Sequence, residues 1–255
     1  MPPLQRPGSF RRVPIVSTRC VVLQTHAYSD TSKILRLMTR EHGPRSAIAR
    51  GVLRPRSRIT GLLEPFAEGI ATLYLKRDRD LHTLSDFELV RERQGLARDL
   101  RRYGGASVLC ELVLRLAPEQ PDEALYRVLS RGLDRLLDVP DGQVAATSLA
   151  TIWELVGALG FSPTFDACQR CGSPVDGGAT FDVHEGGLLC VRCRPGGARL
   201  GANEIAVLRD LARGIATPGR VTAQQLAPLV DFVRYHAAEG YRLRSLDFLF
   251  LSEPQ

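Results

Sequence analysis

The 255-residue sequence predicts an α+β fold, in which a small β-barrel comes first and an α-helical unit follows it. Three observations support this order: short strand-like runs in the first third of the chain, helical periodicity after residue 93, and four cysteines grouped near the three-quarter point. We therefore expect a flexible basic arm (1–14), a barrel (15–92) and a helical unit (93–255), with the cysteine segment inserted in the helical unit at about 166–196.

The barrel is predicted from five runs rich in Val, Ile, Leu and Thr that turn signals separate. These runs cover 17–24, 34–39, 46–50, 69–75 and 81–90. The connections include a turn at 41–44, a basic loop at 54–58 and a charged turn at 77–80. Five strands in about 75 residues are typical of a small barrel such as the OB fold, since a β-sandwich usually needs seven strands.

After residue 93 the apolar residues recur at helical spacing. The clearest helix follows Asp122 as its N-cap and ends before Pro140. Four more helices are expected: 96–117 with a weak point at Gly104-Gly105, 145–159, 203–215, and about 225–239 with Pro228 in its first turn. Trp153 is expected in the core. The C-terminal run 241–251 is expected to close the helical unit, or alternatively to border a groove for a partner peptide.

The cysteine segment predicts one metal site. Cys168, Cys171, Cys190 and Cys193 read C-x2-C, then eighteen residues, then C-x2-C. The two-residue gaps let both thiolates of one turn reach the same tetrahedral ion, and the spacer suits a short hairpin that returns the second pair to the first. We expect one structural Zn²⁺ per chain, because four thiolates leave no open position for water. Two disulfides are the alternative.

Composition and motifs exclude several classes of protein. The sequence contains no apolar run long enough to span a membrane, and its first twelve residues have no apolar segment of a secretory signal. Cys20 and Cys110 lie in apolar runs and are expected to be buried thiols, which suits a reducing cytoplasm. The motifs of phosphate loops, dinucleotide sites, metalloproteases and serine hydrolases are missing, and the five histidines are scattered. We therefore do not expect an enzyme.

The charge of the chain is unevenly distributed. The net charge is +6, but residues 1–93 hold 17 Lys and Arg against 9 Asp and Glu, while the remainder holds 17 against 19. Within 33–58 eight basic residues accompany one acid, Glu41. This pattern predicts that the barrel binds a nucleic acid through its phosphates, with a steep salt dependence. The candidate contact residues are Lys33, Arg40, Arg45, Arg50, Arg54, Arg56 and Arg58, with Tyr28 as the aromatic side chain that can stack on a base.

Several strings, taken in order, resemble the RecO family of recombination mediators. They are YSDTSKILRLMTR (28–40), AIARG (47–51), the basic loop ending at Ser57, LLEPF (62–66), the four cysteines and RLRSLDFL (242–249). The resemblance implies an OB domain followed by a helical domain with a four-cysteine zinc site. It carries over to the four cysteines and to Arg50 in AIARG.

The same resemblance implies a non-enzymatic role in DNA repair and homologous recombination. It implies that the protein binds single- and double-stranded DNA, anneals complementary strands and helps load the recombinase RecA. It further implies RecR and the C-terminal tail of the single-strand-binding protein as partners, and a nucleoid-associated location in the cytoplasm. The residues alone also permit an RNA-binding or ribosome-associated zinc-containing OB protein, or a zinc-dependent nucleic-acid enzyme.

Overall fold

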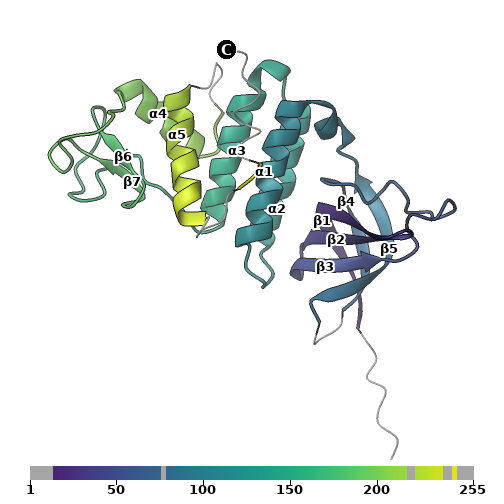
Figure 1. The fold of residues 1–255 in the computed structure, drawn as a ribbon. Helices are drawn as coiled ribbons and strands as arrows, with labels where there is room; N and C mark the ends of the chain where they lie inside the picture. Colours follow the sequence, from purple (N-terminus) through teal and green to yellow (C-terminus); the bar gives the residue numbers. More distant parts are fainter. Residues whose placement is uncertain (1–13, 76–78, 217–221, 238–242, 246–255) are drawn as a thin grey trace, which may run out of the picture.

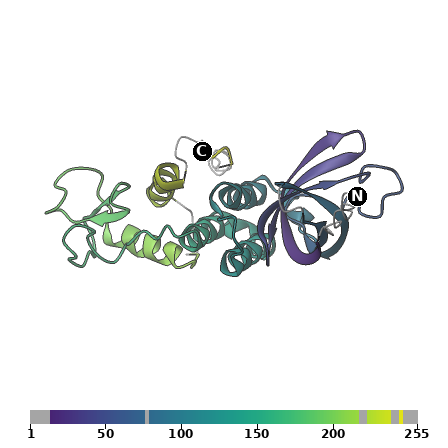
Figure 2. The same ribbon diagram turned by 90° about the horizontal axis from the view of Figure 1, so that it is seen from below.

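The computed structural model describes residues 14–75, 79–216, 222–237 and 243–245. The barrel and the cysteine insertion lie at opposite ends of an elongated molecule, and the helices lie between them (Figure 1). The turned view in Figure 2 shows the same order. The predicted arm 1–14 lies outside the described residues except for Pro14. Among the helices that the structure describes, none has both the length and the apolar character needed to traverse a lipid bilayer.

Five strands form the closed barrel. They are β1 (Ile15–Ser29), β2 (Ser32–Thr39), β3 (Gly43–Ala49), β4 (Glu68–Tyr74) and β5 (Leu81–Arg91). Around the barrel the order is β1-β2-β3-β5-β4, with β4 pairing back onto β1. β3 and β5 are parallel and the other neighbours are antiparallel. This Greek-key connectivity confirms the predicted small barrel and is that of an OB-like fold.

β1 is longer than predicted and is buried on both of its faces where it crosses the barrel. Cys20 and Val22 point into the barrel core, whereas Val21 and Leu23 join the core of the helical unit. This double burial explains the continuous apolar run CysValValLeu, which lacks the alternation of a half-exposed strand. Burial raises the pKa of the Cys20 thiol to about 12, so this residue is a small apolar core residue, as predicted.

The helical unit contains five α-helices among the described residues. They are α1 (Leu100–Leu116), α2 (Glu123–Asp138), α3 (Val144–Ala158), α4 (Ala202–Ala212) and α5 (Ala223–Phe232). Short 3-10 helices cover Gln94–Arg98 and Asp141–Gln143, and a π-helical turn, Val233–Ala237, follows α5. Asp122 caps α2 as predicted, since its side chain accepts a hydrogen bond from the Leu125 amide at 2.8 Å.

Three details of the predicted helices were wrong. The expected helix 96–117 is broken at Asp99, whose carboxylate caps a new helix by accepting from the Arg102 amide at 2.9 Å. The Gly104-Gly105 pair is no weak point, because α1 runs through it. A Cβ at Gly105 would lie 2.5 Å from the Ser148 hydroxyl, so the glycine allows α1 and α3 to approach closely. Pro228 lies in the second turn of α5, not in the first.

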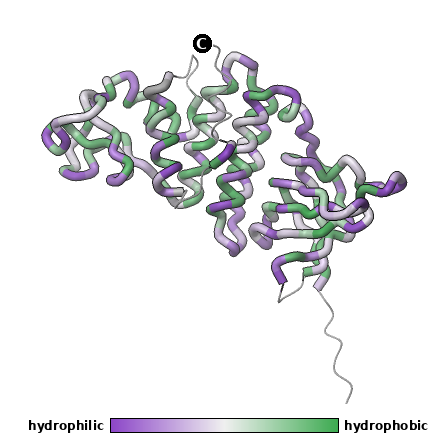
Figure 3. The backbone as a smooth tube through the Cα atoms, in the orientation of Figure 1, coloured by the Kyte–Doolittle hydropathy of each residue, from purple (hydrophilic) through white to green (hydrophobic). Residues whose placement is uncertain are grey.

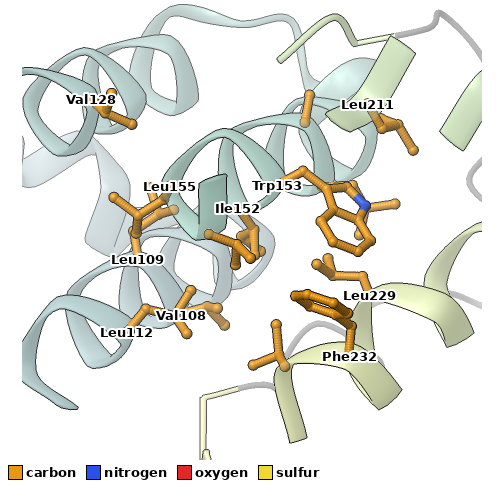
Figure 4. Packing of buried hydrophobic residues seen from close by; sticks show 14 of the residues in the cluster. Val108, Leu109, Leu112, Val128, Ile152, Trp153, Leu155, Leu211, Leu229 and Phe232 are labelled. Carbon is orange, nitrogen blue, oxygen red and sulfur yellow. The ribbon is translucent and has the colours of Figure 1, made fainter. Parts of the chain in front are cut away.

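The core of the helical unit is built around Trp153 of α3, which is 1% exposed. Its indole contacts the rings of Phe165 and Phe232, with centroids 5.7 and 5.6 Å away. Figure 4 shows Trp153, Leu229 and Phe232 converging between α3 and α5. In Figure 3 the hydrophobic colouring follows the strands and helices, whereas the loop after β3 is largely hydrophilic. Trp153 is therefore a core residue, as predicted.

The described part of the C-terminal run packs on α1. Leu243 is buried, and the amide and hydroxyl of Ser245 both donate to the Glu111 carboxylate, the amide at 2.9 Å. The Arg244 amide donates to the same carboxylate at 3.2 Å. These contacts agree with the prediction of a closing element. The rest of the run 241–251 lies outside the described residues.

Candidate nucleic-acid interface and metal centre

One rim of the barrel brings together three arginines and a tyrosine from four separate segments. Tyr28 at the end of β1, Arg50 just after β3, Arg54 in the following loop and Arg79 ahead of β5 line a pocket of about 410 Å³. Gly51 has a φ of 70°, which turns the chain back after Arg50. The Leu53 amide then donates to the Thr31 carbonyl at 3.0 Å, and this bond ties the basic loop to the β1–β2 turn. We call this hollow the Tyr28 pocket.

Tyr28 occupies a β-bulge. Ala27 pairs with Lys33 and Ser29 pairs with Ser32, so Tyr28 is the extra residue of β1 opposite β2. A bulge re-aims the side chain of the added residue, and the Tyr28 side chain is 62% exposed. Within the described part of the chain its ring has no aromatic neighbour and its hydroxyl has no hydrogen-bond partner. Tyr28 therefore presents a free aromatic face beside three arginines.

A second hollow of about 750 Å³ lies between the barrel and the connection from α1 to α2. Arg36, Arg45 and Arg79 line it together with the acids Asp80 and Glu119. Because Arg79 lines both hollows, the two adjoin. The described lining of the Tyr28 pocket also holds three arginines but no acidic residue, so positive charge is less compensated there than in the second hollow.

The other predicted contact residues differ in whether an acidic side chain already neutralises their charge. Lys33 pairs with Glu64 at 2.8 Å, and its side chain is only 16% exposed. Arg40 binds the Glu123 carboxylate at the start of α2, so it links the barrel to the helical unit. Arg45 donates to the carbonyls of Pro44 and Glu119, and it forms no ion pair with the residues that the structure describes.

Arg56 and Arg58 are exposed on the basic loop but line neither hollow. The structure thus brings together Tyr28, Arg50 and Arg54 of the predicted set.

Two arginines of this surface were missing from the predicted set. Arg36 belongs to the basic run, and its alternation with the buried Leu35 and Leu37 could have placed it on the outer face of β2. Arg79 was hidden because two aspartates flank it in ArgAspArgAsp. The barrel connectivity is the signal for Arg79, since the β1–β2 and β4–β5 loops border the same ligand-binding face in OB folds.

The four cysteines of the insertion come together as predicted. Their sulfurs all lie within 4.8 Å of one another, and those of Cys171 and Cys190 are 3.7 Å apart. A tetrahedral ion with sulfur ligands at about 2.3 Å requires sulfur–sulfur edges of about 3.8 Å. All four thiols are free in this structure, with no disulfide among them. The cluster can therefore hold one metal ion.

Two tight turns and a hairpin position these sulfurs. In the first turn the Gly172 amide donates to the Cys168 carbonyl at 2.8 Å, and in the second the Arg194 amide donates to the Cys190 carbonyl at 2.9 Å. The hairpin of β6 (Thr180–Asp182) and β7 (Gly187–Leu189) fills the spacer and returns the second pair to the first. His184 lies in this hairpin but packs edge-on against Tyr235, with ring centroids 4.5 Å apart, and is not part of the cluster.

The backbone also stabilises the thiolate form of one ligand. The Cys190 amide donates to the Cys168 sulfur at 3.4 Å, and this hydrogen bond, with those from the amides of Cys171 and Arg170, lowers the pKa of Cys168 to about 6. Thiolates are the form that binds metal. The insertion is far from the basic rim of the barrel (Figure 1). The metal centre therefore does not contribute to that rim.

Comparison with known families covers nearly the whole chain. The family described as "Recombination protein O N terminal" matches residues 13–93. The family described as "Recombination protein O C terminal" matches residues 97–246. The division between these two matches falls where the barrel ends and the helices begin.

Similar proteins that match over about nine tenths of this chain carry one common name. A DNA repair protein RecO from Anaeromyxobacter sp. (strain K) is 35% identical over 243 residues, which cover 90% of this chain and 93% of that protein. The protein of the same name from Symbiobacterium thermophilum is 36% identical, over 90% of this chain and 94% of its own length. That from Bacillus subtilis (strain 168) is 30% identical, over 91% and 93%.

Proposed function

The chain belongs to the RecO family of DNA repair proteins, and on this premise we propose that it is a recombination mediator that binds DNA through the basic rim of its barrel. In this role it anneals complementary single strands and helps load RecA onto strands coated by the single-strand-binding protein. The mediator acts by binding and positioning strands, without catalysing a covalent step. The family favours DNA over the RNA or ribosomal alternative.

The observation that carries this proposal is the uncompensated charge around the Tyr28 pocket. Within the described residues, the side chains of Arg50, Arg54 and Arg79 form no ion pair and no hydrogen bond to a carboxylate. Three guanidinium groups that converge without a counter-charge repel one another unless an anion lies between them. A nucleic-acid backbone provides such anions in a row, and its binding releases condensed counterions.

We assign separate roles to the barrel and to the helical unit, which occupy different parts of the molecule. We propose that the barrel (15–92) holds the strand, with further contacts from Arg45, Arg56 and Arg58 around the pocket. Lys33 and Arg40 would contact a phosphate only by exchanging their present partners, Glu64 and Glu123. The helical unit (93–255) would hold the partner proteins RecR and the C-terminal tail of the single-strand-binding protein, as the family membership suggests. The protein would act on the nucleoid in the cytoplasm.

The metal in this proposal is one structural Zn²⁺ held by Cys168, Cys171, Cys190 and Cys193. Four thiolates fill a tetrahedral site and transfer much negative charge to the ion, so a water molecule can be neither bound nor activated. The ion would hold the two turns of the insertion together, in a segment whose hairpin strands are only three residues long. Its contribution is to folding.

The test is a charge reversal with a matched control. The double variant Arg50→Glu/Arg54→Glu lowers the net charge by four, and so does Arg98→Glu/Arg234→Glu, which changes two exposed arginines of the helical unit. We expect the first variant to bind single-stranded DNA at least about ten-fold more weakly at low salt, and to anneal complementary strands more slowly. The control variant should keep most of its affinity.

Equal losses in the two variants would show that only the total charge matters and would contradict the proposed interface. The mediator role needs a separate assay, in which strands are precoated with single-strand-binding protein that has or lacks its C-terminal tail. Annealing that depends on the tail supports a mediator. Annealing of bare strands alone would indicate a general nucleic-acid binder.

A further inference from the structure

We propose that the Tyr28 pocket is a subsite for one unpaired nucleotide, whose base stacks on Tyr28 while its flanking phosphates bind Arg50, Arg54 and Arg79. This inference rests on the proposed function, because it concerns how the same rim of the barrel holds a strand. It adds the chemical class of the ligand, a nucleotide with a free base face. It also assigns Tyr28 as the residue that favours an unpaired strand over a duplex.

Tyr28 occupies an added position in the sheet. A regular β1–β2 pairing would need no residue between Ala27 and Ser29, yet β1 carries the added Tyr28 there. A tyrosine that is 62% exposed leaves apolar area in water, which is unfavourable in the isolated protein. The described side chains leave both ring faces uncovered by another aromatic group. A nucleobase would cover one face, and every base offers a flat surface of this kind.

The residues around the Tyr28 ring supply positive charge and neutral surface. The remaining lining of the pocket includes the neutral side chains of Thr31, Ser32, Ile48 and Leu81, and no carboxylate. A volume of about 410 Å³ lies within the range of about 300–1,000 Å³ that small-molecule sites have. The pocket therefore offers a ring for stacking and positive charge for phosphates. Its described lining has no carboxylate that could accept hydrogen bonds from the donor groups of a particular base. The subsite should accept any base.

The ring and the arginines of the pocket differ in which forms of DNA they can bind. In a duplex both faces of a base are covered by its neighbours, so only an unpaired or unstacked base can pack against Tyr28. The arginines bind phosphates, which single strands and duplexes both carry. The ring thus distinguishes the two forms of DNA, and the guanidinium groups do not. Because Arg79 also lines the second hollow, the backbone leaving the pocket can continue past Arg36 and Arg45.

The experiment compares three ligands of equal length, about 20 nucleotides or base pairs each. They are an oligothymidine, an abasic deoxyribose-phosphate strand and a blunt duplex. The variants are Tyr28→Ala, Tyr28→Phe and the triple Arg50→Ala/Arg54→Ala/Arg79→Ala. Tyr74→Ala is the matched control, since Tyr74 is a 37% exposed tyrosine of the same barrel that lines neither hollow. Thermal unfolding of each variant verifies that the fold is kept.

We expect the unmodified protein to prefer oligothymidine over the abasic strand. Tyr28→Ala should weaken oligothymidine binding about five-fold to a hundred-fold and remove that preference, while abasic and duplex affinities stay within about two-fold. Tyr28→Phe should keep the preference, because the ring is retained. The triple arginine variant should weaken the binding of all three ligands.

Any of the following results would overturn the inference. If Tyr28→Ala leaves oligothymidine binding unchanged while the triple variant weakens it, the subsite is wrong and the proposed DNA interface stands. If Tyr28→Ala weakens all three ligands equally, or if Tyr74→Ala has the same effect, the ring does not select unpaired bases. No loss in any variant, the triple included, contradicts both the subsite and the interface.

Discussion

The guanidinium group of Arg93 lies 2.7 Å from the Glu68 carboxylate, and the Arg93 side chain is completely shielded from solvent. Glu68 begins β4, whereas Arg93 follows β5 on the path to the helices. Arg93 also donates to the Asp134 carboxylate of α2 at 2.6 Å and to the Phe66 carbonyl at 3.0 Å. Tyr126 of α2 donates to Glu68 at 2.9 Å. This buried polar cluster joins the barrel to the helical unit.

Removing the charge of Arg93 should strongly destabilise the protein. Arg93→Ala leaves Glu68 buried without its cation, and such a loss typically lowers the free energy of unfolding by about 3–5 kcal/mol. Arg91 provides the control, because it binds the same Asp134 at 2.8 Å but is 46% exposed. Arg91→Ala should cost only about 0–1 kcal/mol. Urea unfolding measures both, and equal effects would contradict a special role for the buried pair.

The same cluster predicts a loss of stability in acid. Burial acts to raise the pKa of Glu68, but hydrogen bonds from Ser130, Arg93 and Tyr126 and the Arg93 charge together hold it below the ordinary value of 4.5. A lowered pKa means that this stabilisation is complete above the unfolded pKa and is lost as the pH falls through the folded pKa. Glu68→Gln should therefore be less stable than the original at pH 7 but show a shallower decline in acid. Unfolding curves at several pH values test this, and parallel declines would disprove it.

Gly43 at the start of β3 should tolerate no side chain. Its φ is 68°, and a Cβ there would lie 2.6 Å from the Gln120 carbonyl oxygen of the α1–α2 connection. Gly43→Ala should lower the free energy of unfolding by about 2–5 kcal/mol, from backbone strain plus this collision. Gly61 has a φ of 81° with open space around it, so Gly61→Ala should cost only about 1–2 kcal/mol. Similar losses at the two positions would show that the collision is relieved by movement.

Losing a cysteine ligand should remove the metal without weakening DNA binding by the barrel. Cys168→Ser should release the bound ion and lower the midpoint of thermal unfolding, because the insertion depends on four ligands. Cys110→Ala, which changes a buried thiol of α1, should keep one ion per chain. Metal analysis and strand-binding curves verify both points. A large drop in affinity for single strands would place part of the interface in the insertion.

Arg79 should contribute to the salt dependence of strand binding. Each phosphate contact adds about 0.7 to the slope of log affinity against log salt for a single strand. Arg79→Ala should therefore reduce the slope by about that amount, whereas the exposed Arg98→Ala in the helical unit should leave it unchanged. Binding titrations over a range of salt concentrations measure the slope. An unchanged slope for Arg79→Ala would place its guanidinium away from the phosphates.

Local patterns in the sequence predict most of the architecture. The five strand runs, the Asp122 cap and the C-x2-C spacing each depend on residues close together in the chain, and the structure confirms them. The break at Asp99 was missed because the apolar spacing continues across it, and only the capping geometry ends one helix and starts another. Gly104-Gly105 was misread because its role lies in contact with α3, which local propensity does not encode.

The site was predictable in part for a similar reason. Charge counting locates the basic run, but it cannot tell Lys33, which Glu64 neutralises, from Arg50, which has no ion-pair partner among the described residues. Those pairings are set by tertiary contacts between residues far apart in sequence. Arg79 joins the pocket through the closure of the barrel, and its two flanking aspartates conceal it from any count of local charge. All four cysteines of the candidate metal site could be named from the sequence, because their spacing alone predicts that they come together.

The two-sided burial of β1 means that the barrel is not a detachable module. A chain cut after Arg91 would uncover Val21, Leu23 and Met38, which now belong to the same apolar cluster as the helices. Such a fragment would expose an apolar surface that the helices now cover, and it would tend to self-associate through that surface. A substitution at one of these positions would therefore alter the packing of both the barrel and the facing helices, so the two parts of the chain are constrained to change together.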